Sequence, residues 1–172
     1  AKKHDALKDS VATYESSLSS NDPLAAYRVA LHGGSADRGR DLVHEHVSAQ
    51  CLRCHDIESE AHQLGPNLGG VGTRLNPEQL LESLVFPNRA IADGFEMVSL
   101  KLKNRAEAIA GTVISEDDNQ FVVAQVNGDQ MTIDKASVAE EQRLSVSSMP
   151  PMVGVLTMPE IRDAVAYLQT LK

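Results

Sequence analysis

The two cysteines of the chain stand three residues apart, at Cys51 and Cys54, and His55 follows directly. This C-x-x-C-H pattern is typical of c-type haem attachment. The spacing suits that chemistry, because two thioethers hold the haem vinyl positions while the adjacent histidine comes under the iron as its proximal ligand. The motif therefore predicts one covalent haem c, attached at Cys51 and Cys54, with its iron bound by His55.

Two other kinds of site also use a C-x-x-C pair. A thioredoxin-like redox pair lies near a βαβ pattern, and the sequence around residue 51 shows no such alternation. A zinc site requires two further ligands, for which His44 and His46 are the nearest candidates. These histidines are two residues apart, so they face opposite sides of a helix and would not both turn to one metal. The pattern favours covalent haem over both alternatives.

Helices are predicted on both sides of the motif. Ser35 is a plausible N-cap for a helix that leads into it, and the glycine-rich stretch 65–72 behind it is expected to be a loop. A further helix is predicted to begin at Asn76, which stands one residue before a proline. The last predicted helix begins with a capping box at Thr157 and runs to the C-terminus.

From residue 97 the hydrophobic period changes from that of a helix to that of a strand. Asn127-Gly128 is a strong signal for a type I′ hairpin, so we expect an antiparallel meander. It would form a β insertion of about 40 residues, at about 97–135, in a chain that is otherwise helical. The four expected strands are 97–103, 109–114, 120–126 and 130–133.

Five short segments follow one another along the chain: Gly39–Val43, Cys51–His55, Gly65–Leu68, Ser148–Pro150 and Ala164–Leu168. Together they resemble a class I cytochrome c. The resemblance covers roughly residues 35–96 and 145–172. It implies a mainly α cytochrome c fold, with the β meander between the haem helices and the methionine loop. Residues 1–34 would then be an N-terminal helical extension, and 35–172 the cytochrome c domain.

The β insertion is a departure from the small cytochromes. It makes the chain similar to the haem-binding domain of planctomycete and verrucomicrobial proteins, which is often the C-terminal module of a larger dehydrogenase. This resemblance implies an electron carrier rather than an enzyme, fed by a redox partner protein or a fused dehydrogenase domain. Two alternatives stay open. One is a haem enzyme or gas sensor in which the sixth coordination position of the iron is open or labile. The other is an interaction module in which haem only stabilises the fold.

The resemblance also implies a sixth ligand. Met149 matches the family pattern best, because the prolines that follow it stiffen the loop and direct the thioether. Met152 is the alternative in a shifted register. A histidine is the other chemically reasonable ligand, and the candidates are His44, His46 and His62.

Four further residues have expected roles, the first two of them from the same resemblance. Pro66 and Leu68 would lie at the haem edge, where the Pro66 carbonyl could accept the Nδ1 proton of His55. Arg74 could pair with a haem propionate, although a solvated charge is the alternative. Tyr167 is expected to pack the last helix onto Gly39, where glycine permits close approach.

Composition excludes several classes of protein. Sixteen basic and 24 acidic residues give a net charge of −8, which argues against nucleic acid or an anionic membrane as the main partner. No stretch approaches the roughly 18–20 apolar residues that a membrane span requires. The N-terminus has no apolar core of a secretory signal, so we interpret it as a mature or excised end. Because c-type haem is attached outside the cytoplasm, the expected location is the periplasm or another extracytoplasmic compartment.

Overall fold

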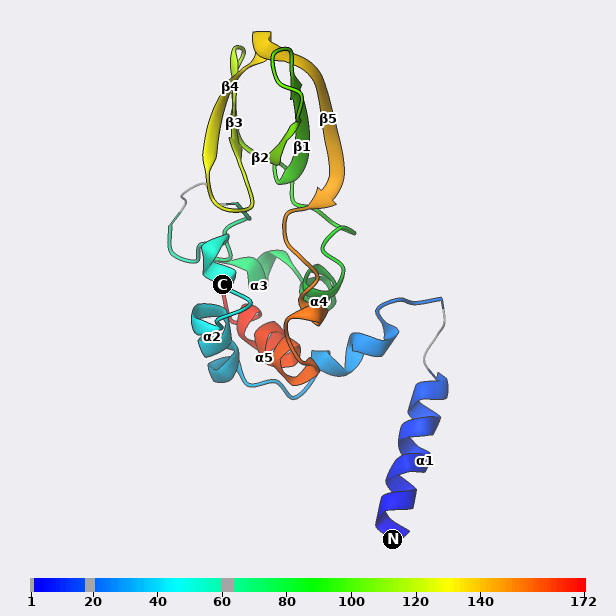
Figure 1. Cartoon of the computed structure of the whole chain (residues 1–172). Helices are drawn as coiled ribbons and strands as arrows, with labels where there is room; N and C mark the ends of the chain where they lie inside the picture. The colour runs from blue at the N-terminus through cyan, green and yellow to red at the C-terminus, as the bar shows by residue number, and fades with distance from the viewer. Residues whose placement is uncertain (1, 18–20, 60–63) are drawn as a thin grey trace.

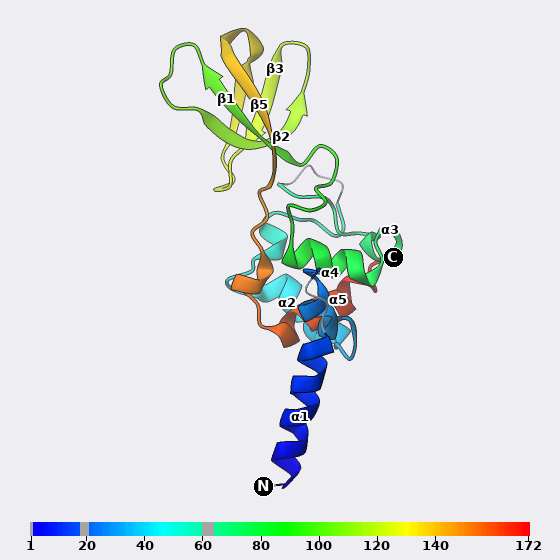
Figure 2. The ribbon, with the colours of Figure 1, turned by 90° about the vertical axis from the view of Figure 1, so that its right-hand side faces the viewer.

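The computed structural model describes residues 2–17, 21–59 and 64–172. A five-stranded antiparallel sheet stands on one end of a helical body (Figures 1 and 2). The helical elements are α1 (Lys2–Ser17), η1 (Ala25–Leu31), α2 (Ala36–Glu45), η2 (Cys51–Arg53), α3 (Val71–Arg74), α4 (Pro77–Val85), η3 (Lys135–Ser137), η4 (Met152–Gly154) and α5 (Met158–Leu168). The strands are β1 (Glu96–Leu102), β2 (Ile109–Glu116), β3 (Gln120–Ala124), β4 (Gln130–Asp134) and β5 (Val138–Ser147).

The longer helices of the body begin where their capping residues predict. The Ser35 side chain caps α2, and Asn76 forms a capping box with Gln79 at the start of α4. Before α5, the backbone N–H of Thr157 donates to the Glu160 carboxylate at 2.7 Å. Side chains within the first turn therefore set where each of these three helices begins.

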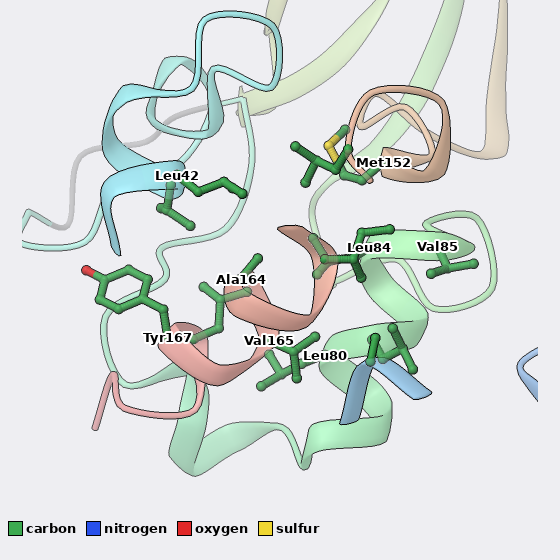
Figure 3. Close-up of a cluster of buried hydrophobic side chains, with 14 of the residues drawn as sticks. Leu42, Leu80, Leu84, Val85, Met152, Ala164, Val165 and Tyr167 are labelled. Atoms are coloured by element: carbon green, nitrogen blue, oxygen red, sulfur yellow. The ribbon is translucent and has the colours of Figure 1, made fainter. Parts of the chain in front are cut away.

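One hydrophobic cluster holds the body together. α5 lies between α2 and α4, so apolar side chains from both reach it (Figure 3). Leu24 and Ala30, which precede α2, are buried in the same cluster. α1 projects away from the body (Figure 1). The predicted domain boundary at residue 34 stays a prediction. The cluster includes Leu42, Leu80, Leu84, Val85, Met152, Ala164, Val165 and Tyr167.

The closest helix contact joins α2 to α5. A Cβ on Gly39 would lie 1.9 Å from the backbone oxygen of Asp163 and 2.7 Å from the Cβ of Tyr167. The expected packing of the Tyr167 helix onto Gly39 is confirmed. Asp163 also accepts hydrogen bonds from the Ser35 backbone N–H at 2.8 Å and from Arg38 Nε at 2.7 Å. The Arg38 hydrogen bond is the main reason that the pKa of Asp163 lies below its ordinary value.

The sheet has the strand order β4-β3-β2-β1-β5, and all its neighbours are antiparallel. The predicted β3–β4 hairpin is present, but its turn is not type I′. Gly128 N–H donates to the Gln125 carbonyl, and Gly128 has a φ of +94° whereas Asn127 does not have a positive φ. This is the geometry of a three-residue loop that ends on a left-handed glycine. Residues 125–129 are called the β3–β4 turn below.

The expected fold class is wrong. The chain is α+β rather than mainly α, because its sheet has five strands and spans residues 96–147 instead of about 97–135. The unexpected strand is β5, which pairs with β1 along its whole length. Most β5 side chains are exposed, as is common for an edge strand, so the sequence there shows no apolar alternation. The sheet consequently runs directly into the loop that carries Met149.

No helix within the described ranges is long and apolar enough to cross a membrane, as the sequence predicts.

Candidate functional site

The C-x-x-C-H motif lies on a tight turn that follows α2. Residues 46–55 are called the motif loop. At its start, the Nδ1 atom of His46 accepts hydrogen bonds from the backbone N–H groups of Ser48 and Ala49, with N···N distances of 3.2 and 3.0 Å. At its end, the N–H groups of Cys54 and His55 both donate to the carbonyl of Cys51. One turn of backbone thus carries both cysteines, and His55 follows it directly.

Both cysteines are free thiols and partly buried. Burial raises the pKa of Cys51 and of Cys54, and for Cys54 the positive charge of Arg53 acts in the opposite direction. The thiols therefore stay protonated at neutral pH. Cys51 and its neighbour Leu52 pack against the main hydrophobic cluster of the body.

The ring of His55 is oriented by the loop that follows it. Its Nδ1 atom lies 2.7 Å from the carbonyl oxygen of Pro66, so the predicted hydrogen bond is confirmed. A carbonyl only accepts, so Nδ1 carries the proton and Nε2 keeps its lone pair. Burial lowers the pKa of His55, although the bond to Pro66 partly opposes this shift. Neutral His55 can therefore act as a ligand through Nε2.

Gly65 leaves the space in which this ring lies. A Cβ at residue 65 would be 2.6 Å from Cε1 and 2.8 Å from Nδ1 of His55. Gly65 is also held close to the motif, because its N–H donates to the Cys54 carbonyl at 2.8 Å. Only glycine fits between the ring and this backbone without displacing one of them.

We expect Gly65→Ala to displace the His55 ring and weaken its bond to Pro66. The cost of the added methyl is about 2 kcal/mol, typical of overpacking a well-filled site. Thermal unfolding would report this loss, and ¹⁵N NMR of the His55 ring would report a loss of the Nδ1–H tautomer. Pro66→Ala is the matched control because it keeps the backbone carbonyl. An unchanged tautomer in Gly65→Ala would contradict this interpretation.

The rest of the glycine-rich loop is tied to itself and to the motif. Leu68 packs against the main cluster, and its N–H donates to the Asp56 carbonyl at 2.7 Å. Arg74 donates to the carbonyls of Asn67 and Gly69, each at 2.6 Å. The guanidinium is exposed and braces the loop, and its predicted pairing with a propionate stays a prediction.

The methionines differ in burial. Met149 is partly buried at the edge of the main cluster, and its backbone N–H donates to the Ser147 hydroxyl at 3.1 Å. Met152 is only 4% exposed and lies inside the cluster (Figure 3). Met158 packs against the same cluster.

Two of the three alternative histidine ligands have other partners. His44 Nε2 lies 3.1 Å from the Tyr167 hydroxyl, and Nδ1 of His46 already accepts two backbone N–H groups. His62 lies outside the described residues. In the described ranges, no group of three or more His, Cys, Asp or Glu side chains is placed to hold a metal ion, so a zinc site of the kind considered above is not formed there.

Two contacts were not predicted from the sequence. One is the Arg38–Asp163 pair that joins α2 to α5, and the other is a hydrogen bond from Arg53 to the Asn127 carbonyl at 3.3 Å. A buried acidic residue amid the apolar positions of α5 is a signal for the first. The second joins residues 74 positions apart, and no local pattern indicates it.

No protein-family model matches the chain, and a search of curated proteins finds no match to it.

Proposed function

We propose that this chain is a one-electron carrier with a single haem c, attached through Cys51 and Cys54 and bound at its iron by His55. The observation that carries the proposal is the hydrogen bond from His55 Nδ1 to the Pro66 carbonyl within an intact C-x-x-C-H motif. This bond leaves Nε2 free to act as a ligand atom, on the residue that follows two free thiols in the chain. The proposal rests on the site and not on a mainly α fold.

The donor set fits a covalently held haem. Two thiols on one turn can each form a thioether, and the absence of a Cβ at Gly65 leaves room for the imidazole ring. Cys51, Leu52, Leu68 and Met149 are all partly buried against one apolar cluster, so the site is apolar on its inner side. When bound, the iron supplies a reversible Fe(III)/Fe(II) couple.

The residues of the chain would set the properties of that couple. The Pro66 carbonyl fixes the ring orientation of His55 and raises the basicity of Nε2. A thioether from Met149 would raise the potential by stabilising the reduced iron, and a ligand on each face would close the iron to small molecules. These roles support electron transfer over the haem enzyme or gas sensor alternative.

Met149 is the methionine that we assign as the sixth ligand. Its side chain is partly exposed at the edge of the cluster, whereas Met152 is buried among apolar side chains and acts as a core residue there. The bond from its backbone N–H to Ser147 fixes Met149 at the point where β5 ends.

The electron donor or acceptor would be a separate redox protein or a fused dehydrogenase domain. Haem ligation to a C-x-x-C-H motif takes place outside the cytoplasm, so we propose a periplasmic or other extracytoplasmic location. The excess of acidic over basic residues favours a protein partner over nucleic acid.

The proposal is tested on the intact 172-residue chain matured with haem-ligation machinery. We expect denaturing electrophoresis to show haem peroxidase stain in the protein band, because thioethers survive denaturation. The variant Cys51→Ser/Cys54→Ser should lose the stain. The optical spectra of the oxidised and reduced protein would then report spin state and axial ligands. A colourless band from properly matured protein would exclude the proposed function.

A further inference from the structure

Arg53 joins the motif loop to the sheet. It stands between the two cysteines, and one terminal nitrogen of its guanidinium donates to the Asn127 carbonyl of the β3–β4 turn at 3.3 Å. The other terminal nitrogen donates to the Gln50 side chain at 3.4 Å. Figure 1 shows this end of the β3–β4 hairpin directed at the helical body. A residue of the motif thus contacts a turn that follows it by more than 70 positions.

The residue that Arg53 braces inside the loop has a strained backbone. Gln50 has φ +43° and ψ +46°, and among the described residues it is the one non-glycine residue with a positive φ. This conformation is unfavourable for a residue with a Cβ, so the surrounding contacts must maintain it. Arg53 supplies two of them, through its side chain and through its backbone N–H, which donates to the Gln50 carbonyl at 2.9 Å.

The strands on either side of the β3–β4 turn are anchored in the core of the sheet. Val123 and Ile133, on the strands beside the turn, are 0% and 4% exposed in the core of the sheet. The hairpin register is regular, from Gln120 opposite Asp134 to Ala124 opposite Gln130. The Asn127 carbonyl is therefore held in place independently of the motif loop.

We propose that Arg53 is a positioning residue through which the sheet holds the motif loop in the conformation that presents Cys51, Cys54 and His55. The sheet is then a support for the site and not a separate appendage. That this conformation serves haem attachment rests on the proposed function. The coupling between the β3–β4 turn and the motif loop through Arg53 is a property of the chain alone. A purely local role, in which Arg53 braces only Gln50, is the competing explanation.

Amide hydrogen exchange on the full-length protein separates the two explanations. Arg53→Ala is expected to raise exchange about fivefold in both the motif loop and the β3–β4 turn, the effect of losing one modest hydrogen bond on each side. Arg53→Lys, which keeps a donor on a long stem, should restore part of the protection. Faster exchange in the motif loop alone would overturn the proposal and support the local role. Unchanged exchange in both segments would overturn it as well.

A second variant tests the coupling from the side of the sheet. Ile133→Val removes one buried methyl group from β4 and should raise exchange in the β3–β4 turn. If Arg53 transmits the support, Ile133→Val also raises exchange about twofold in the motif loop, and this increase disappears when Arg53→Ala is already present. An increase that persists in the double variant would overturn the proposal.

The matched control is Arg105→Ala. Arg105 is an exposed arginine beside β1 whose ion pair with Glu107 spans 3.9 Å, so its removal changes the net charge equally without touching the motif loop. In the Arg105→Ala variant, amide hydrogen exchange at residues 46–55 should stay unchanged. Haem staining of the same samples reports the proposed function separately. A stained protein without coupling would refute only this inference, and an unstained protein with coupling would refute only the proposed function.

Discussion

Met149→Ala is expected to lose the sulfur-to-iron charge-transfer band of the oxidised protein and to become at least partly high-spin. In the proposed haem protein, alanine would offer no sixth ligand, so the iron would be left with His55 and whatever small molecule could enter. The reduction potential should fall, on the order of 0.2 V within the ~0.8 V range that axial ligands span. Optical spectroscopy and a redox titration check these expectations.

Two further methionine variants make this result specific. Met152→Leu replaces a buried core methionine by a side chain of similar volume, so it should cost less than about 1.5 kcal/mol and leave the spectrum unchanged. Met158→Leu should behave in the same way, because Met158 packs against the same cluster. If Met152→Leu removed the band and Met149→Ala kept it, Met152 would be the ligand. If the native protein lacked this band and all three variants kept its low-spin spectrum, a histidine would be the ligand.

The parts of the structure that follow from short-range signals could be predicted. The side chains of Ser35 and Asn76 each accept a backbone N–H of the first turn, and before α5 the Glu160 carboxylate accepts the N–H of Thr157. This chemistry is visible in four consecutive residues. The bond from His55 to Pro66 has another origin. It was expected from the resemblance to class I cytochromes c and not from a short-range signal, and the structure contains it.

The fifth strand could not be predicted in the same way. β5 is an edge strand whose charged residues face solvent, and it is defined by its pairing with β1, some 40 residues earlier in the chain. Arg143 on β5 pairs with Glu116 on β2, which again depends on how the sheet brings distant strands together. Hydrophobic periodicity contains no information on such contacts when neither face of the strand is buried.

The turn of the β3–β4 hairpin shows a different limit. Asn127-Gly128 correctly indicates a hairpin, but the loop is one residue longer than a type I′ turn requires, so only Gly128 needs a positive φ. The difference places the Asn127 carbonyl where Arg53 can reach it. The sequence motif therefore locates the hairpin, and only the folded sheet shows which backbone group faces the motif loop.

Gly39→Ala is expected to destabilise the helical body by about 3 kcal/mol. Alanine favours a helix over glycine by about 1 kcal/mol, so propensity alone would stabilise α2. Packing reverses the sign, because the new Cβ would lie 1.9 Å from the backbone oxygen of Asp163, which cannot rotate away as a flexible side chain could. α2 and α5 must separate to accept it, and this overpacking exceeds the gain in propensity.

Separation of these helices should weaken every contact that depends on their approach. The hydrogen bonds of Asp163 with Ser35 and Arg38 would lengthen, and Tyr167 would move away from His44. Denaturant and thermal unfolding measure the loss, which for a chain of this size corresponds to a fall in melting temperature of about 10 °C. Gly154→Ala is the control, because a Cβ there meets nothing within 4 Å and should leave stability nearly unchanged. A Gly39→Ala protein as stable as the native chain would show that α2 and α5 do not pack at this distance.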